Sequence, residues 1–222
     1  MLFSLLRDPS LTSNPLLLIL TFLAILIAVL TALSFHEFSH ALVANWLGDP
    51  TAERMGRLTL NPLAHLDPVG FIMLLVAGFG YAKPVPYDPR YLRSPRSGSV
   101  LIGIAGPISN ILFASVFALV LKLIGPSLGI NNLLTMFCSF GAMINVNLAI
   151  FNLIPIPPLD GSKLLNAILA DSKWLHLRMT IEKQGPFLLL ILIMLDIFGG
   201  IGIFSRIFET ADVTFFHFFG LV

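Results

Sequence analysis

The sequence predicts an all-α membrane protein, a polytopic helical bundle with about four strong transmembrane spans and a short re-entrant or hairpin segment. Of its 222 residues, 56% are hydrophobic and only 11% are charged, whereas soluble domains carry about 25% charged residues. Several apolar runs reach the ~20 residues that a helix needs to cross the hydrocarbon core. Because the sequence shows no separate soluble domain between these runs, we expect one membrane-embedded domain over residues 1–222.

The strongest apolar run lies near the N-terminus. Residues 15–35 contain no charged side chain. We predict a span over about 15–47, as one long helix or two abutting helices, that ends before Gly48-Asp49-Pro50. The run leads directly into further helical sequence without a convincing small-residue cleavage site, which argues against a signal peptide. We therefore expect it to remain as the first span.

Proline and glycine set the limits of the remaining spans, because both interrupt helices. The predicted spans are about 99–123, stopped by Gly125-Pro126; about 132–153, stopped by Pro155, Pro157 and Pro158; and about 186–208. A further apolar run at about 69–80 is too short to cross a bilayer as a helix. We expect it to form a re-entrant segment or hairpin that is shielded by protein or lines a wet cavity.

The distribution of basic residues predicts the orientation. The loops 48–98 and 155–184 hold ten of the thirteen Lys and Arg residues. Four spans place both loops on one side, which the positive-inside rule makes cytoplasmic, with both termini on the other side. The net charge is +1 and no block of basic residues suggests nucleic-acid binding. The sequence thus predicts a multi-pass protein of the cell membrane, in contact with the lipid bilayer.

The motif His36-Glu37-Phe38-Ser39-His40 follows the first apolar run. On a helix, this spacing places both imidazoles on one face, where they can bind one Zn²⁺ with Glu37 as general base. A chance group of polar residues at a helix end is the alternative, but ionisable groups in membrane spans are costly and usually functional. Catalytic zinc sites usually have three protein ligands, so a third ligand must come from elsewhere.

Asp160 is the candidate for the third ligand. The prolines that precede it prevent regular helix, so the chain must unwind there and leave polar groups free to line a cavity. The orientation derived from the charges brings Asp160 to the same level as His36 and His40. The alternative role is an N-cap for a helix that starts at Gly161. Capping and metal binding are compatible.

Three other polar residues allow two interpretations each. We expect Asn110 to pack beside Gly106 and Pro107, with the orientation of a metal ligand as the alternative. We expect His65 to make a structural hydrogen bond, with a role in catalysis near a cavity mouth as the alternative. Asp196 either pairs inside the bundle or lies where a helix ends near Gly199-Gly200.

Five segments, in this order, carry a family resemblance. They are the His36–His40 motif, Leu60–Gly70 (LNPLAHLDPVG), Ala82–Pro86 (AKPVP), Ala105–Asn110 (AGPISN) and Asn152–Gly161 (NLIPIPPLDG). Over roughly residues 18–170, the chain resembles the site-2 protease family of intramembrane zinc metalloproteases, in its compact prokaryotic branch without PDZ or CBS domains. The resemblance implies that His36, His40 and Asp160 bind Zn²⁺ and that Glu37 is the general base. It also implies that Asn152 holds the substrate or stabilises the oxyanion; an interhelical hydrogen bond is the alternative role for this residue.

The function implied by this resemblance is that of an intramembrane zinc metalloendopeptidase. Such an enzyme hydrolyses peptide bonds within or near transmembrane segments of other membrane proteins, which are its substrates and partners, and here the active site would face the cytoplasmic side. No cofactor besides zinc is expected, and the oligomeric state stays open. The alternative is a non-proteolytic membrane metal-binding or chaperone-like relative. Glu37 argues against this alternative, because the three ligands do not need it to bind metal.

Overall fold

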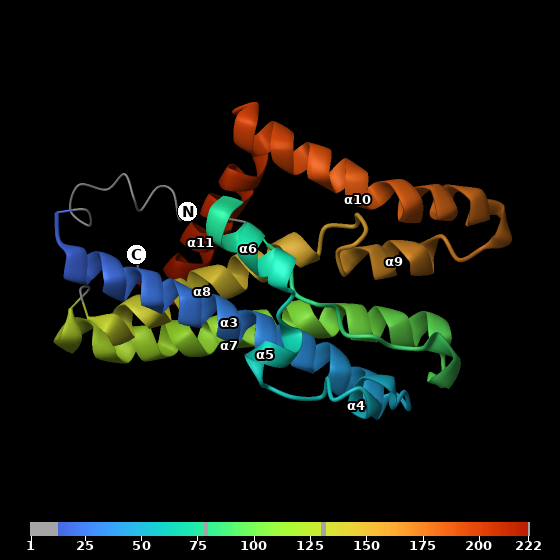
Figure 1. Ribbon diagram of the computed structural model, residues 1–222, viewed down its shortest axis with the longest axis horizontal. Helices are drawn as coiled ribbons and strands as arrows, with labels where there is room; N and C mark the ends of the chain where they lie inside the picture. The colour runs from blue at the N-terminus through green and yellow to red at the C-terminus, as the bar shows by residue number, and fades with distance from the viewer. Residues whose placement is uncertain (1–12, 78–79, 130–131, 222) are drawn as a thin grey trace.

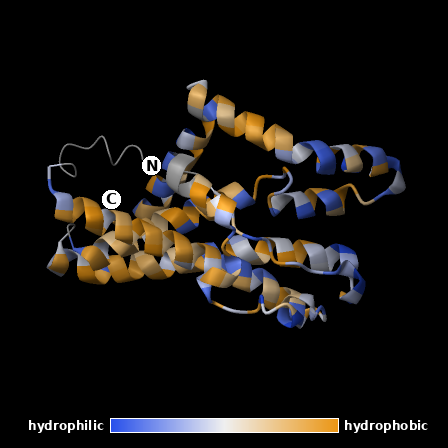
Figure 2. Ribbon diagram, in the orientation of Figure 1, coloured by the Kyte–Doolittle hydropathy of each residue, from blue (hydrophilic) through white to orange (hydrophobic). Residues whose placement is uncertain are grey.

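The computed structural model describes residues 13–77, 80–129 and 132–221, and these residues form helices, turns and a single isolated β-bridge. Three of the described helices are long and apolar enough to cross a membrane: α3 (Pro15–Trp46), α7 (Pro95–Leu128) and α8 (Leu133–Asn152). They lie side by side (Figure 1), and hydrophobic residues dominate most of their length (Figure 2). The prediction of an all-α membrane protein is confirmed.

Small side chains fill the contacts between these three helices. The fully buried residues include Ala24 and Ala28 of α3, Ala114 and Ala118 of α7, and Ala142 and Ala149 of α8. Large apolar residues such as Leu112 and Leu123 point outward instead. In a bilayer, apolar surface can face lipid without penalty, and helices associate where small residues let their backbones approach closely. The bundle therefore has an alanine core and a lipid-facing leucine surface.

The first predicted span is one continuous helix, which decides between the two forms that the sequence left open. Helix α3 begins at Pro15, where the Asn14 side chain accepts a hydrogen bond from the Leu17 N–H, and it ends at Trp46. The predicted stop of the next span at Gly125-Pro126 was wrong. Helix α7 continues to Leu128 and ends at Gly129, whose φ of +73° favours glycine. Pro126 has no N–H to donate to the carbonyl four residues earlier, so the helix continues past it with one hydrogen bond fewer.

The predicted fourth span over 186–208 was also wrong, because this region is not one helix. Helix α10 (Leu175–Phe198) and helix α11 (Ile203–Phe218) divide it. Between them, Gly200 and Gly202 have φ values of +66° and +69°, which end the first helix and turn the chain. The Asp196 carboxylate accepts hydrogen bonds from the Ile203 and Phe204 N–H groups and so caps α11. Asp196 therefore lies at a helix end, one of its two predicted positions.

Short elements join the long helices. They are α4 (Thr51–Arg54), α5 (Pro62–His65), α6 (Pro68–Ala77) and the 3₁₀ turn η1 (Pro89–Tyr91) between α3 and α7, and α9 (Gly161–Ile168) and the 3₁₀ turn η2 (Ser172–Trp174) between α8 and α10. Helix α6 covers most of the predicted re-entrant segment; residues 78–79 of that prediction, including Gly78, lie outside the described residues.

The chain leaves and re-enters the α6 region at one point, where Leu66 and Ala82 form the antiparallel bridge. Next to it, the Lys83 N–H donates to the His65 carbonyl over 2.8 Å. Gly70 lies against the Tyr81 backbone, so a larger residue would collide there. The bridge places the segment 82–86 beside α3.

Candidate metal centre

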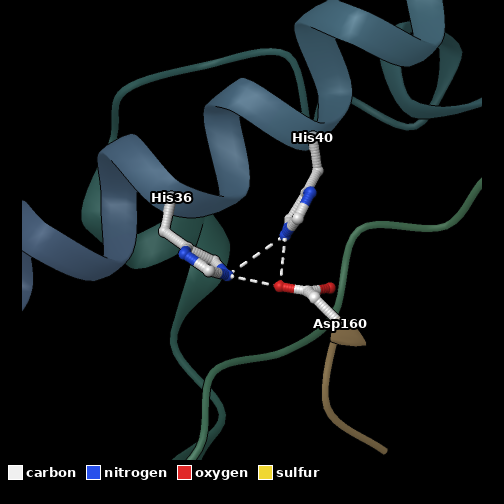
Figure 3. A group of neighbouring side chains, drawn as sticks. All are labelled: His36, His40 and Asp160. Carbon is white, nitrogen blue, oxygen red and sulfur yellow. Dashed lines mark hydrogen bonds and ion pairs between the residues drawn. The ribbon is translucent and has the colours of Figure 1, made fainter. Parts of the chain in front are cut away.

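Helix α3 and the unwound segment after α8 bring three predicted ligands together. His36, His40 and Asp160 are between 4% and 8% exposed. The two Nε2 atoms lie 3.1 Å apart, and each lies 3.1 Å from the Asp160 Oδ2 atom (Figure 3). The i, i+4 spacing on α3 explains the histidine pair, and the non-helical turn before α9 explains how Asp160 reaches it. These ligand atoms form a nearly equilateral triangle.

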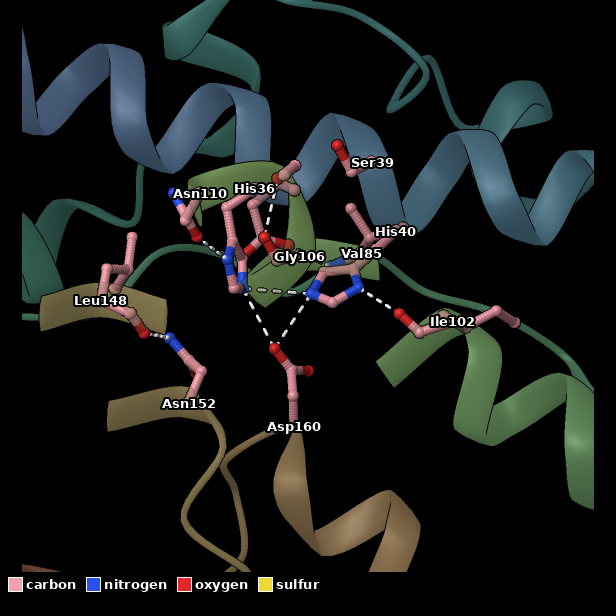
Figure 4. Close-up of polar contacts among 12 residues, drawn as sticks. His36, Ser39, His40, Val85, Ile102, Gly106, Asn110, Leu148, Asn152 and Asp160 are labelled. Atoms are coloured by element: carbon pink, nitrogen blue, oxygen red, sulfur yellow. Dashed lines mark hydrogen bonds and ion pairs between the residues drawn. The ribbon is translucent and has the colours of Figure 1, made fainter. Parts of the chain in front are cut away.

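Hydrogen bonds at the far side of each ring decide the tautomers. The Nδ1 atom of His36 lies 2.6 Å from the Asn110 Oδ1 atom, and the Nδ1 atom of His40 lies 2.6 Å from the Ile102 carbonyl (Figure 4). Both partners are acceptors, so each Nδ1 carries a proton, and in the neutral imidazole each Nε2 then presents a lone pair. The Asn110 amide is oriented in turn, because its Nδ2 donates to the Asn145 Oδ1 over 2.7 Å.

The triangle has the chemistry of a zinc site. With both imidazoles neutral, two lone pairs and a carboxylate oxygen face one another, an arrangement that is repulsive until a cation binds between them. Zn²⁺ binds imidazole nitrogen and carboxylate oxygen at roughly 2.0–2.2 Å, which separates tetrahedral ligands by about 3.3 Å. The observed separations of 3.1 Å fit this geometry.

Gly106 of α7 lets the helix backbone approach the triangle. A Cβ atom there would lie 2.6 Å from the His40 Nε2 and 2.7 Å from the His36 Nε2. Ile102, Gly106 and Asn110 follow one another at intervals of four residues and so share one face of α7. That face provides a hydrogen-bond acceptor for each histidine and, between them, space for the ligand triangle.

Asp160 offers one oxygen to the triangle and the other to Lys163. The Lys163 Nζ atom lies 2.7 Å from Oδ1. Burial raises the pKa of Asp160, and the positive charge of Lys163 lowers it. The Asp160 side chain makes no capping hydrogen bond to α9. Asp160 therefore occupies the predicted N-cap position of α9, but its side chain does not cap the helix.

Glu37 lies beside the triangle without belonging to it. Its side chain is 8% exposed, and its Oε2 atom accepts a hydrogen bond from the Val85 N–H over 3.1 Å. Val85 belongs to the segment 82–86 that returns from α6. Glu37 therefore lies next to the candidate metal position, with one oxygen held by backbone from a distant part of the chain.

The other predicted residues have different surroundings. The Asn152 Nδ2 atom donates to the Leu148 carbonyl of its own helix over 3.0 Å (Figure 4), and in the described part of the chain no hydrogen bond joins Asn152 to the three ligand atoms. His65 is buried and its Nε2 atom bonds to the Thr59 carbonyl over 2.8 Å. The preferred interpretation of Asn110 as packing was incomplete, because it holds His36. Its spacing of four residues from Gly106 was the signal in the sequence.

Comparisons with known proteins support the same chemistry. The family model described as peptidase family M50 matches residues 127–195. YwhC of Bacillus subtilis is 38% identical over 184 residues, which cover 79% of this chain and 81% of the relative. MJ0611 of Methanocaldococcus jannaschii is 36% identical over 155 residues, which cover 69% of this chain and 74% of the relative. The names of both relatives refer to zinc metalloproteases. No solved structure matches the chain.

The extent of the match to YwhC, together with the buried His36, His40 and Asp160 group and the apolar bundle that holds it, is sufficient to assign the family. The chain belongs to peptidase family M50, the site-2 protease family, and is a zinc metalloprotease embedded in the membrane.

Proposed function

We propose that this metalloprotease hydrolyses peptide bonds within or near the transmembrane segments of other membrane proteins. The proposed zinc ligands are His36, His40 and Asp160, and the proposed general base is Glu37. The observation that carries the proposal is the triangle of ligand atoms that follows the apolar stretch of α3, with a buried carboxylate beside it.

The depth of the site supports a substrate within the membrane. Helix α3 has 21 residues from Pro15 to Phe35 before the first histidine. At 1.5 Å per residue they extend about 31 Å, close to the ~30 Å thickness of the hydrocarbon core. The proposed site therefore lies near the boundary of the core, where it can reach the end of a substrate's transmembrane segment.

We assign the site to the cytoplasmic side of the cell membrane. The link between α3 and α7 and the region after α8 carry most of the basic residues. Hydrophilic residues gather at the same end of the bundle (Figure 2). The positive-inside rule gives this end its orientation.

Each residue has a distinct part in the proposed hydrolysis. Bound zinc would lower the pKa of a coordinated water toward ~7 and polarise the scissile carbonyl. Glu37 would accept a proton from the attacking water and deliver it to the leaving amine. The Val85 N–H holds the Oε2 atom of Glu37 in place for this exchange. Asn152 would bind the substrate backbone or the oxyanion after releasing the Leu148 carbonyl.

The substrate must unwind before it can react. The peptide groups of a transmembrane helix are hydrogen-bonded within the helix, so their carbonyls are not accessible to the attacking water. The unwound segment 153–160 supplies non-helical backbone next to the ligand triangle. We propose that a substrate helix opens beside this segment.

The test compares wild type with Glu37→Gln in purified protein, using a panel of membrane-anchored peptides and an assay of bound zinc. We expect zinc in both proteins and a rate of cleavage by the variant that is lower by a factor of about 10²–10⁴. Glu209→Gln, on the exposed face of α11, is the matched control and should cleave like wild type. Equal cleavage by wild type and Glu37→Gln would refute this mechanism. Zinc without cleavage of any peptide by wild type would favour the non-proteolytic alternative.

A further inference from the structure

Arg57 is a buried cation that the proposed chemistry does not use. It lies between α4 and α5, and its side chain is 6% exposed. Its guanidinium donates to three backbone carbonyls: Ala64 over 2.6 Å, Pro84 over 3.2 Å, and Lys83. In the described part of the chain no carboxylate forms an ion pair with it. Arginine is rarely buried without a charged partner, so these contacts require an explanation.

The carbonyls that Arg57 binds belong to the segment that touches Glu37. Lys83 and Val85 are the only residues with an N–H group between 83 and 86, because Pro84 and Pro86 have none. The Lys83 N–H donates to the His65 carbonyl, and the Val85 N–H donates to Glu37. Every backbone donor of this stretch is therefore engaged, and Arg57 binds the first two carbonyls.

One peptide group connects Arg57 with Glu37. The Pro84 carbonyl and the Val85 N–H belong to the same planar unit, in which oxygen and hydrogen point in opposite directions. Arg57 binds the oxygen of this unit, and Glu37 accepts from its N–H. A cation at the carbonyl polarises the peptide group and strengthens its N–H as a donor. The arginine thus acts on the carboxylate through a single rigid unit.

The two charges also attract each other. Burial lowers the pKa of Arg57, and the negative charge of Glu37 opposes this effect. The guanidinium stays charged at neutral pH, because the ordinary pKa of arginine is above about 12. The relationship between Arg57 and Glu37 therefore combines a hydrogen-bonded connection with an electrostatic one.

We propose that Arg57 is a positioning residue for Glu37: it fixes the Pro84–Val85 peptide group so that the Val85 N–H holds the carboxylate beside the metal. This inference rests on the proposed role of Glu37 as general base. An arginine with a purely structural role would bind the same carbonyls without any effect on Glu37. The two roles differ in what happens at the Val85 N–H and in the kinetics of cleavage.

Hydrogen exchange tests the connection directly, because the stretch 83–86 has only two exchanging amides. Residue-resolved exchange is measured on the full-length, zinc-loaded protein for wild type, Arg57→Gln, Arg57→Lys and Glu37→Ala. We expect Glu37→Ala to accelerate exchange at Val85 alone. Arg57→Gln should accelerate both Lys83 and Val85, by about tenfold or more, with zinc content unchanged. Arg54→Gln, at an exposed position of α4, is the matched control and should leave both amides as in wild type.

Cleavage kinetics provide the second measurement. For a membrane-anchored peptide that wild type cleaves, Arg57→Gln should lower kcat about tenfold or more with KM close to wild type, because a displaced base affects chemistry more than binding. Arg57→Lys should restore part of the rate, since it keeps the charge and can reach one carbonyl.

The outcomes separate the two proposals. Exchange at Val85 that stays at the wild-type rate in Arg57→Gln overturns the role of Arg57. If Arg57→Gln loses zinc, the exchange rate at Val85 in Arg57→Lys is compared with wild type instead. Loss of zinc in both variants also overturns the positioning role, because Arg57 would then be needed for the fold itself. Absence of cleavage by wild type would refute the proposed function, while the exchange measurement would still decide whether Arg57 holds the Val85 peptide group.

Discussion

The Nδ1 atom of His36 lies 2.6 Å from the Oδ1 atom of Asn110, a residue 74 positions away in the chain. This contact places the proton of His36 on Nδ1 and directs the Nε2 lone pair toward His40 and Asp160. Asn110 itself cannot rotate freely, because its amide nitrogen donates to Asn145 over 2.7 Å and to Ala32 over 3.3 Å. A chain of amides through α7 and α8 therefore orients a proposed ligand on α3.

The first prediction concerns Asn110. Replacing it by alanine should weaken zinc binding about 10–100-fold, because His36 loses the acceptor that orients its ring. The measurement is a competition titration against a chromophoric chelator. Ser115→Ala is the matched control, since the Ser115 hydroxyl bonds to the Ile111 carbonyl of the same helix. An unchanged zinc affinity in Asn110→Ala would mean that the ring is held by other contacts.

The second prediction concerns Gly106. Alanine there would place a Cβ atom 2.5 Å from the His36 Cε1 atom and almost as close to both Nε2 atoms. We expect Gly106→Ala to purify without stoichiometric zinc and to cleave nothing. Gly125→Ala is a control on the same helix, because the nearest atom to its new Cβ would be an ordinary 3.8 Å away. Metal analysis of both variants decides, and full zinc occupancy in Gly106→Ala would contradict the close approach of α7.

The third prediction concerns the pH dependence of zinc binding. Both imidazoles must be deprotonated to bind, so affinity should fall as the pH drops below the ordinary histidine pKa of about 6.5. The ordinary pKa of an aspartate is about 3.9, so Asp160 is already ionised in this range and takes up no proton as the pH falls toward 5. The logarithm of the affinity should therefore approach a slope of two per pH unit between about pH 5 and 6. A slope of three would show that Asp160 titrates with the histidines.

Much of the fold follows from the sequence, because hydrophobic length and helix stops are local properties. The continuous apolar stretch before His36 predicts α3, and the prolines after Asn152 predict the end of α8. The predicted helix ends were wrong where a proline did not interrupt a helix, and where glycines interrupted an apolar stretch. Helix α7 continues to Leu128 in spite of Pro126, and the glycines at 200 and 202 divide a stretch whose hydropathy alone predicts one span.

The sequence also predicted part of the candidate site. The HExxH spacing fixes His36 and His40 on one helical face, and this holds for any helix with that sequence. Asn110 was harder to assign, because a buried asparagine next to Gly106 and Pro107 suits packing as well as ligand orientation. Arg57 was not singled out, since nothing in the sequence distinguishes it from the other basic residues of the loop.

The sequence by itself determined the class of this protein and its chemistry, because a bilayer selects for apolar length and zinc selects for ligand type and spacing. Only the tertiary structure decided how the site is assembled. It brought Asp160 to 3.1 Å from both histidines, directed the Asn110 oxygen at His36, and connected Arg57 with Glu37 through the Pro84–Val85 peptide group. Such contacts join segments far apart in the chain, and their distances depend on how helices and loops pack, which no local pattern specifies.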